Sequence, residues 1–157
     1  MIRRGRWLFL VLSVVCLQWL SGYLGIFLGT VPHWGLIFVA ALAIDKGPFL
    51  GETLGFFLGF CVDVLSVRLF GGNALALTWI GYGIGRLQRQ IDVSRPFSQM
   101  ALLSLVSLVY AILTGFIHGI VDRSFSLTLV WTLLMQGVYN TLLAPVVFYL
   151  VARMRVY

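Results

Sequence analysis

The chain has 157 residues, of which 61% are hydrophobic and 10% are charged, and its formal net charge at pH 7 is +6. A soluble domain of this length needs far more polar surface, so the composition excludes an ordinary soluble fold and indicates an integral membrane protein. The basic residues are dispersed over a few short segments instead of lining one continuous patch, which argues against nucleic-acid binding.

Apolar blocks in the sequence predict six membrane-crossing helices, because one crossing needs about 20 apolar residues. The first block, from Trp7 to Ile44, is long enough for two crossings, with Gly29 and Pro32 at the turn between them. The basic start and the apolar run after it resemble a signal peptide, but no small-x-small cleavage site follows, so we expect an uncleaved first helix. The predicted helices cover approximately residues 7–28, 33–44, 48–67, 73–86, 97–121 and 127–152.

The basic residues predict how these helices are oriented. If the N-terminus is cytoplasmic, only Arg68 and Arg123 lie on the outer side. The remaining basic residues then face the cytoplasm, namely Arg3, Arg4, Arg6, Lys46, Arg86, Arg89, Arg95, Arg153 and Arg155. This distribution satisfies the positive-inside rule, whereas a re-entrant second segment would move the later basic loops outside. We therefore expect one transmembrane domain over residues 1–157, a compact all-α bundle of six helices with both termini in the cytoplasm.

Glycine recurs at every fourth position in the third predicted helix. The series is Gly47, Gly51, Gly55 and Gly59, and its next position is Asp63. Each glycine inside a helix costs about 1 kcal/mol relative to alanine, so helix propensity does not explain the series. Small residues let membrane helices approach closely, and we expect the row to be a helix-packing or partner interface.

Two acids lie inside the same helix. Glu52 and Asp63 are about three helical turns apart and point to nearly the same side. Acids inside a membrane usually face the protein interior and have a partner there. The candidate partners of Asp63 are Arg68, His118 and Arg123, and those of Glu52 are Lys46, Arg86 and Arg89. A proton or cation path between the two acids is a weaker alternative, because no third acid bridges the gap.

Small and polar side chains also recur along one side of the fifth and sixth helices. These stripes consist of Ser104, Ser107, Ala111, Thr114 and His118, and of Thr132, Gln136 and Asn140. Such stripes allow membrane helices to pack closely and to exchange hydrogen bonds. We expect Glu52, His118, Gln136 and Asn140 to be buried polar groups. His118 is expected to be hydrogen-bonded and not a metal ligand, because no second ligand stands at a suitable spacing.

Catalytic motifs are missing from the sequence. It contains no Gly-x-Ser-x-Gly, no His-Glu-x-x-His and no P-loop, and its five carboxylates are too scattered to hold a metal and a phosphate together. Cys16 and Cys61 are embedded in apolar runs and show no metal-binding or disulfide pattern. We expect no catalytic residue, no metal and no cofactor, and therefore not an enzyme.

One stretch is more specific than hydropathy. Residues 46–85, KGPFLGETLGFFLGFCVDVLSVRLFGGNALALTWIGYGIG, resemble the signature region of the MreD family of rod shape-determining proteins. The features shared with the family are a Gly-Pro turn, glycine at every fourth residue, an aspartate near the outer end of the helix and a Gly-rich turn with Asn-Ala-Leu. They fall here at Gly47, Pro48, Gly51, Gly55, Gly59, Asp63, Gly72, Asn73, Ala74, Leu75, Gly81 and Tyr82. The resemblance adds Gly72 and Asn73 to the candidate interface. Before the second helix, Pro32 fits the family's frequent Pro-Asp start, but His33 replaces the acid.

The resemblance implies a non-enzymatic scaffold or regulatory subunit of the bacterial cell-elongation complex, multi-pass in the inner membrane, with a role in cell shape and peptidoglycan synthesis. The implied partners are MreC, the actin-like MreB, the glycosyltransferase RodA and a class B penicillin-binding transpeptidase. Arg86, Arg89 and Arg95 form a cytoplasmic basic loop that can meet a protein partner or anionic lipid. Whether the chain forms a homo-oligomer stays open.

The family also resembles, in helix arrangement, the substrate-binding subunits of energy-coupling-factor transporters. The alternative function is therefore a small-molecule-binding, vitamin-type transporter subunit. It predicts a defined polar pocket towards the outer side of the bundle, and the polar set of this chain is thin for that function.

Overall fold

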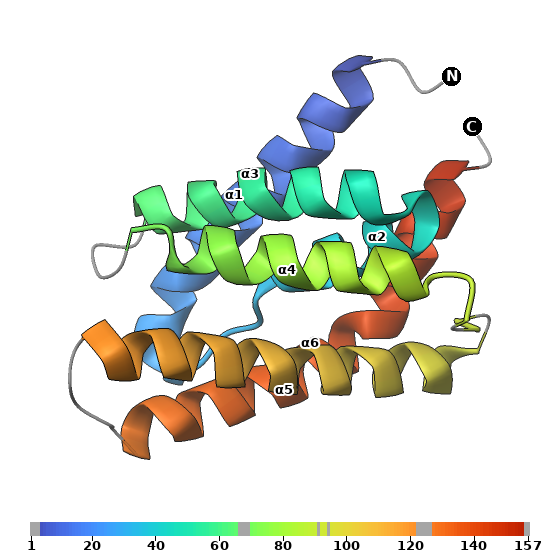
Figure 1. Cartoon of the computed structure of the whole chain (residues 1–157). Helices are drawn as coiled ribbons and strands as arrows, with labels where there is room; N and C mark the ends of the chain where they lie inside the picture. The colour runs from blue at the N-terminus through green and yellow to red at the C-terminus, as the bar shows by residue number, and fades with distance from the viewer. Residues whose placement is uncertain (1–3, 66–69, 91, 94, 122–126, 156–157) are drawn as a thin grey trace.

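The computed structural model describes residues 4–65, 70–90, 92–93, 95–121 and 127–155. These residues form six α-helices and contain no strand, as predicted (Figure 1). Each described helix end lies within three residues of its predicted position, and the predicted end of the third helix at residue 67 lies outside the described residues. The helices are α1 (Arg4–Leu28), α2 (Trp34–Lys46), α3 (Pro48–Leu65), α4 (Gly72–Leu87), α5 (Pro96–Val121) and α6 (Leu127–Arg155).

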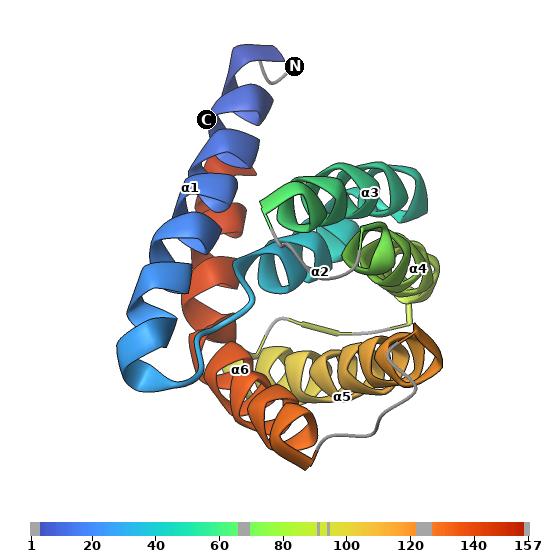
Figure 2. The ribbon, with the colours of Figure 1, turned by 90° about the vertical axis from the view of Figure 1, so that its left-hand side faces the viewer.

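The short helix α2 is the centre of the fold. It contacts all five other helices, and the run from Gly35 to Ala43 is buried throughout. Figure 2 shows α2 between α1 and α6 on one side and α3 and α4 on the other. A helix that is apolar all round is suited to complete enclosure by protein. At 13 residues, α2 is about 20 Å long, which is less than the roughly 30 Å of a bilayer's hydrocarbon core.

Two pairs of helices surround this centre. α3 and α4 make the most extensive contact in the molecule, and α5 and α6 make the next. α4 also contacts α5, and both α5 and α6 contact α2. α6 contains Pro145, which removes a backbone hydrogen bond from the helix interior, and the helix changes direction along its length (Figure 2).

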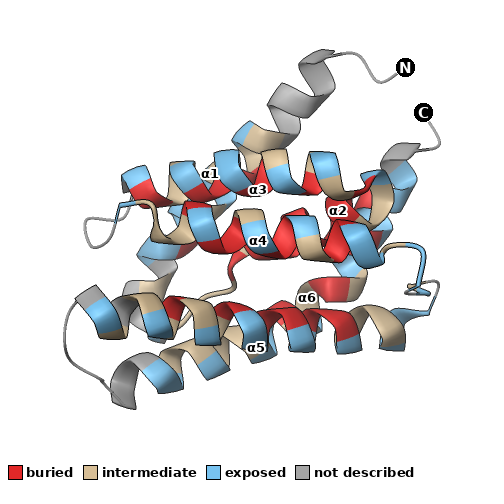
Figure 3. Ribbon diagram, viewed as in Figure 1, coloured by how far each residue is buried: buried red, intermediate tan, exposed pale blue. Residues whose placement is uncertain are grey.

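The outer surface of the molecule is more apolar than that of a soluble protein. Buried residues face the interior between the helices, and the outward faces carry exposed apolar side chains (Figure 3). Examples are Phe49 at 78%, Trp79 at 70% and Phe116 at 64% exposure. In lipid, such faces need no polar cover.

Length and composition identify membrane spans within the described residues. Two stretches, Pro96–Ile117 and Val130–Arg153, are long and apolar enough to cross a membrane, and Val11–Tyr23 is a shorter apolar helical stretch. α2 and α4, at 13 and 16 residues, are shorter than the about 20 residues of a usual crossing.

Candidate functional site

The glycine row of α3 lies against α4 of the same chain. A Cβ atom added at Gly51, Gly55 or Gly59 would come within 3.0 Å of the α4 backbone, closer than real Cβ atoms come. The contact is reciprocal, because a Cβ at Gly81 or Gly85 of α4 would meet the backbone of α3 in the same way. The two helices therefore pack backbone to backbone, and the missing side chains permit the approach.

Gly47, the first member of the row, ends α2. Its φ of +92° with a ψ of −175° belongs to a backbone region that is accessible essentially to glycine alone. Its N–H donates to the carbonyl oxygen of Ala43 at 2.9 Å, and α3 begins at the next residue, Pro48, where the missing N–H is tolerated. Gly47 thus shapes the turn from which the α3–α4 pair starts.

Asp63, the next position of the glycine series, caps the N-terminus of α4. Its side chain is 1% exposed. Oδ2 accepts hydrogen bonds from the N–H groups of Gly71 at 3.1 Å and Ala74 at 2.8 Å, and Oδ1 accepts one from the N–H of Asn73 at 3.1 Å. The first N–H groups of a helix lack intrahelical partners, and this helix end is electropositive, so a carboxylate complements it in both respects. Gly71, the N-cap residue, has no side chain that could do this.

Asn73 extends this cap to α5. Its amide Nδ2 donates to Oδ1 of Asp63 at 2.9 Å, and its Oδ1 accepts a hydrogen bond from the hydroxyl of Tyr110. Asp63, Asn73 and Tyr110 thereby connect α3, α4 and α5 through side chains. Chains of hydrogen bonds strengthen one another where the local dielectric is low.

A second set of hydrogen bonds joins α2, α5 and α6. The side chain of His33 caps α2 by accepting the N–H of Leu36 at Nδ1, 3.1 Å away, and its own N–H donates to Oδ1 of Asn140 at 2.8 Å. Nδ2 of Asn140 donates to Oγ of Ser107 at 3.1 Å. The ring of His33 lies edge to face with that of Tyr110, with centroids 4.9 Å apart, so the two sets meet there.

Gln136 adds a further tie between α6 and the start of α2. Its Nε2 donates to the carbonyl oxygen of Val31 at 3.2 Å, and the residue is half-buried. Asn140, one helical turn later, is 1% exposed. Both side chains thus face the connection that leads from α1 into α2.

Glu52 is exposed, so the prediction that it is buried in the bundle is wrong. Positions four residues apart drift about 40° around a helix, so the face of α3 that contacts α4 turns along its length. Near Glu52, the face of α3 that contacts α4 is centred on Gly51, and Glu52 lies outside it. Three steps of four residues later, the same face includes Asp63. Lys46, an expected partner of Glu52, instead forms an ion pair with Asp45 at 2.9 Å.

The predicted cationic groups are placed only in part. Arg86, Arg89 and Arg95 are exposed. Arg68 and Arg123 lie outside the described residues, as does the side chain of His118, so the partners expected for Asp63 from the sequence are not among those that the structure describes. The described donors to Asp63 are backbone and amide N–H groups instead.

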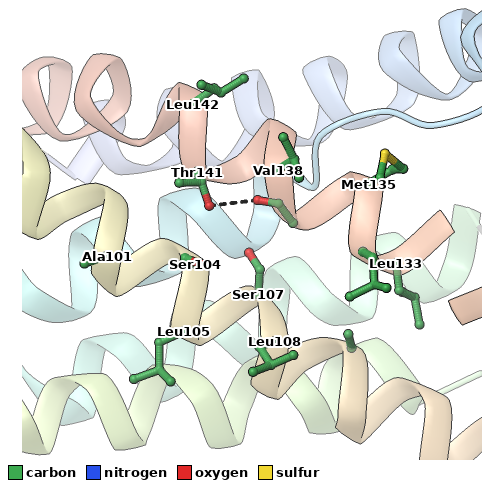
Figure 4. Close-up of a pocket in the computed structure, with 13 residues that line it drawn as sticks. Ala101, Ser104, Leu105, Ser107, Leu108, Leu133, Met135, Val138, Thr141 and Leu142 are labelled. Carbon is green, nitrogen blue, oxygen red and sulfur yellow. Dashed lines mark hydrogen bonds between the residues drawn. The ribbon is translucent and has the colours of Figure 1, made fainter. Parts of the chain in front are cut away.

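A groove of about 690 Å³ lies between α5 and α6 (Figure 4). Its walls include the small residues Ala101 and Ser104 of α5 and the apolar residues Val138 and Leu142 of α6. Two residues of its walls have hydroxyl groups that are already hydrogen-bonded within the protein. Ser107 accepts a hydrogen bond from Asn140, and Thr141 donates one to the carbonyl oxygen of Gly137 at 2.8 Å. A molecule that enters the groove would therefore contact mainly apolar side chains.

His33 and Tyr110 are the two residues that sequence reasoning missed. His33 follows Pro32 directly before an apolar run, which is the position of a helix cap, and that signal was available. Tyr110 lies between Ser107 and Thr114 at spacings of three and four, so it belongs to the polar stripe of its helix. Because tyrosine is aromatic, its hydroxyl was not counted among the polar groups of this stripe.

The described side chains hold helices together and show no reactive arrangement. In the part of the chain that the structure describes, no group of three His, Cys, Asp or Glu residues could hold a metal ion. The carboxylate of Asp63 accepts hydrogen bonds at the N-terminus of α4. These side chains satisfy polar groups of five helices, α2 to α6, and of the connections that lead into them.

A comparison with known protein families gives a match over a region longer than residues 46–85. The sequence model of a family described as rod shape-determining protein MreD matches residues 1–154. The comparisons with curated proteins and with solved structures give no match. The matched region contains all six helices except the last residue of α6.

Proposed function

The chain belongs to the MreD family of rod shape-determining proteins, and from this premise we propose that it is a non-enzymatic membrane scaffold of the cell-elongation complex. As a member of this family it is a bacterial membrane protein with a role in cell shape. The finer proposal is that it holds or regulates peptidoglycan-synthesis proteins through contacts between helices in the inner membrane.

The observation that carries the proposal is the use made of the buried polar side chains. Asp63 and Asn73 bind the start of α4 and Tyr110, and Asn140 binds Ser107 and the start of α2. These groups make a fixed arrangement of helices whose outer faces stay apolar. A fixed apolar surface is suited to binding other membrane helices through close packing.

Six crossings with both termini in the cytoplasm are part of the proposal. It is supported by the positive-inside bias and by the position of the first turns of α1 and the last turns of α6 at the same end of the molecule (Figures 1 and 2). A single cysteine at Phe70 or at Arg89, in a Cys16→Ser/Cys61→Ser background, tests it. A membrane-impermeant maleimide should label Phe70→Cys in intact spheroplasts and Arg89→Cys only after lysis. Equal labelling of both before lysis would contradict this topology.

The proposed partners are MreC, MreB, RodA and a class B penicillin-binding transpeptidase. Co-expression with tagged MreC, followed by purification in a mild detergent, is the direct experiment. The proposal expects a stoichiometric complex that survives size-exclusion chromatography. Recovery of the chain alone, under conditions in which another membrane complex stays intact, would reject the scaffold.

A second candidate function is suggested by the groove between α5 and α6 (Figure 4). Its volume of about 690 Å³ lies within the range of roughly 300–1,000 Å³ that is usual for small-molecule pockets. A transporter subunit would need a polar set there, but the hydroxyls of Ser107 and Thr141 are engaged within the protein. Native mass spectrometry that finds one bound small metabolite per chain would favour this function over the scaffold.

A further inference from the structure

A second groove, between α4 and α5, has an almost entirely apolar lining. It has a volume of about 320 Å³. Its walls are formed mainly by Trp79, Gly83 and Leu87 of α4 and by Leu102, Leu105 and Val109 of α5. Gly83 leaves it open, because a Cβ added there would meet nothing within 4 Å. This groove is distinct from the one between α5 and α6, although Leu105 contributes to both.

The groove ends near a basic segment of the chain. α4 and α5 are joined by residues 88–95, which contain Arg89 and Arg95, and Arg86 lies in the last turn of α4. Residues 79, 83 and 86 are spaced by four and three, so Arg86 continues the groove edge formed by Trp79 and Gly83. Figure 1 shows α4 and α5 side by side, with this connection at one end of both.

This end of the molecule carries a net positive formal charge. All three arginine side chains are exposed. Asp92 is the acid of the same segment, so residues 86–95 carry a formal charge of +2. An apolar groove therefore ends beside a segment with three exposed arginines, Arg86, Arg89 and Arg95, which we call the arginine cluster.

We propose that this groove and the arginine cluster together bind one anionic phospholipid. An acyl chain lies along the α4–α5 groove, and the phosphate of the headgroup accepts hydrogen bonds from the guanidinium groups of Arg86, Arg89 and Arg95. Guanidinium is suited to phosphate because its planar donors can form paired hydrogen bonds. A soluble acidic protein would match the charge alone, whereas a phospholipid matches both the charge and the apolar wall beside it.

Native mass spectrometry of the full chain tests the site. The protein is released from detergent micelles that contain equal amounts of phosphatidylglycerol and phosphatidylcholine with identical acyl chains. The wild type is expected to retain phosphatidylglycerol in preference, and Arg86→Gln to lower the ratio of the two lipids about fivefold, the factor that corresponds to one basic residue at a membrane surface. The triple change Arg86→Gln/Arg89→Gln/Arg95→Gln should abolish the preference. Arg153→Gln, an exposed arginine on α6, is the charge control and should change nothing.

The groove is tested separately from the charge. Gly83→Leu places a side chain in the groove, and its Cβ would meet nothing within 4 Å. Gly115→Leu adds the same side chain at an open position of α5 that is not part of the groove. Retention of phosphatidylglycerol should fall several-fold in Gly83→Leu and stay unchanged in Gly115→Leu. If Gly83→Leu does not fold, Val109→Trp narrows the same groove from α5 and serves instead.

Three results would overturn the proposal. Equal retention of both lipids by the wild type would remove the site altogether. Undiminished phosphatidylglycerol in Gly83→Leu or Val109→Trp would mean that lipid meets only a basic surface. Unchanged lipid retention in the triple arginine variant, together with loss of a co-purifying cytoplasmic protein, would assign the arginines to a protein partner.

Discussion

The α3–α4 pair and the α5–α6 pair are both antiparallel neighbours, but they pack in opposite ways. In the first pair, glycines bring the two backbones together, and an added Cβ at Gly51, Gly55 or Gly59 has no room. In the second pair, a groove of about 690 Å³ remains, and a Cβ at Gly137 would meet only the Cβ of Ser107 at 3.4 Å. A glycine in a membrane helix therefore permits close packing only where the backbone of a neighbouring helix fills the space left by the missing side chain.

The two pairs also differ in how their polar groups are satisfied. Asp63 places a carboxylate at the first N–H groups of α4, which ties the end of α3 to the start of α4. Between α5 and α6, the described structure shows an amide–hydroxyl contact from Asn140 to Ser107. We infer that α3–α4 is the rigid part of the molecule and that α5–α6 tolerates change, and the following predictions test this contrast.

The largest effect is expected from Asp63→Ala. It leaves three backbone N–H groups and the amide of Asn73 without their acceptor, and each buried unsatisfied group costs about 1–3 kcal/mol. We expect the free energy of unfolding, measured in mixed micelles, to fall by about 3–5 kcal/mol. Asp63→Asn, which keeps one acceptor oxygen, should lose distinctly less. Equal losses in the two variants would show that the cap does not act through its acceptor atoms.

Gly55→Ala is expected to be the next most harmful change. Its Cβ would overlap the carbonyl group of Leu77, and because that is backbone, relief requires the two helices to separate. Overpacking of this kind typically costs about 1–3 kcal/mol, against a gain of about 1 kcal/mol in helix propensity. Gly115→Ala, at an open position, should show the gain alone. In detergent, the thermal midpoint should therefore fall in Gly55→Ala and rise in Gly115→Ala. A stabilised Gly55→Ala would refute the close contact.

Tyr110→Phe should have a smaller effect. It removes the hydroxyl that donates to Asn73 and leaves the ring contact with His33 in place. Single hydrogen bonds between membrane helices contribute about 0.6 kcal/mol on average, so we expect a loss of about 1 kcal/mol or less. Tyr82→Phe, an exposed tyrosine of α4, is the matched control and should be neutral in the same unfolding measurement.

The smallest effect is expected from Gly137→Ala in α6. The new methyl group makes an ordinary contact with Ser107, so the helix-propensity gain of up to about 1 kcal/mol is not opposed by a clash. The thermal midpoint should stay the same or rise slightly. A loss as large as that of Gly55→Ala would mean that the two helix pairs are equally tight, and the contrast between them would be wrong.

Much of the architecture was predictable from residue patterns. Apolar blocks with Gly and Pro between them indicated six helices, and the four-residue glycine series indicated a packing face on the third. The helix ends at Gly47-Pro48 and before Trp34 carry local signals that need no tertiary contact. Polar stripes predicted that Ser107 and Asn140 belong to helix faces suited to hydrogen bonding, and the structure joins them at 3.1 Å.

The partners of these residues were not predictable. His33 and Asn140 are 107 positions apart in the chain, and Asn73 and Tyr110 are 37 apart, so no periodicity connects them. The same limit produced the error at Glu52, because its spacing from Asp63 suggested a shared environment. Burial depends on which side of α3 the neighbouring helix occupies at each level along its axis.

The sequence by itself determined that this chain belongs in a membrane, how many helices it forms and which face of α3 is built for close approach, because hydropathy and residue size act locally. Only the tertiary structure decided that α4 is the neighbour of that face and that the carboxylate of Asp63 caps the start of α4. It also decided that the buried α2 is enclosed by the other five helices. These outcomes depend on which distant segments of the chain come into contact in the fold. A carboxylate can accept hydrogen bonds from any donor that the fold places near it.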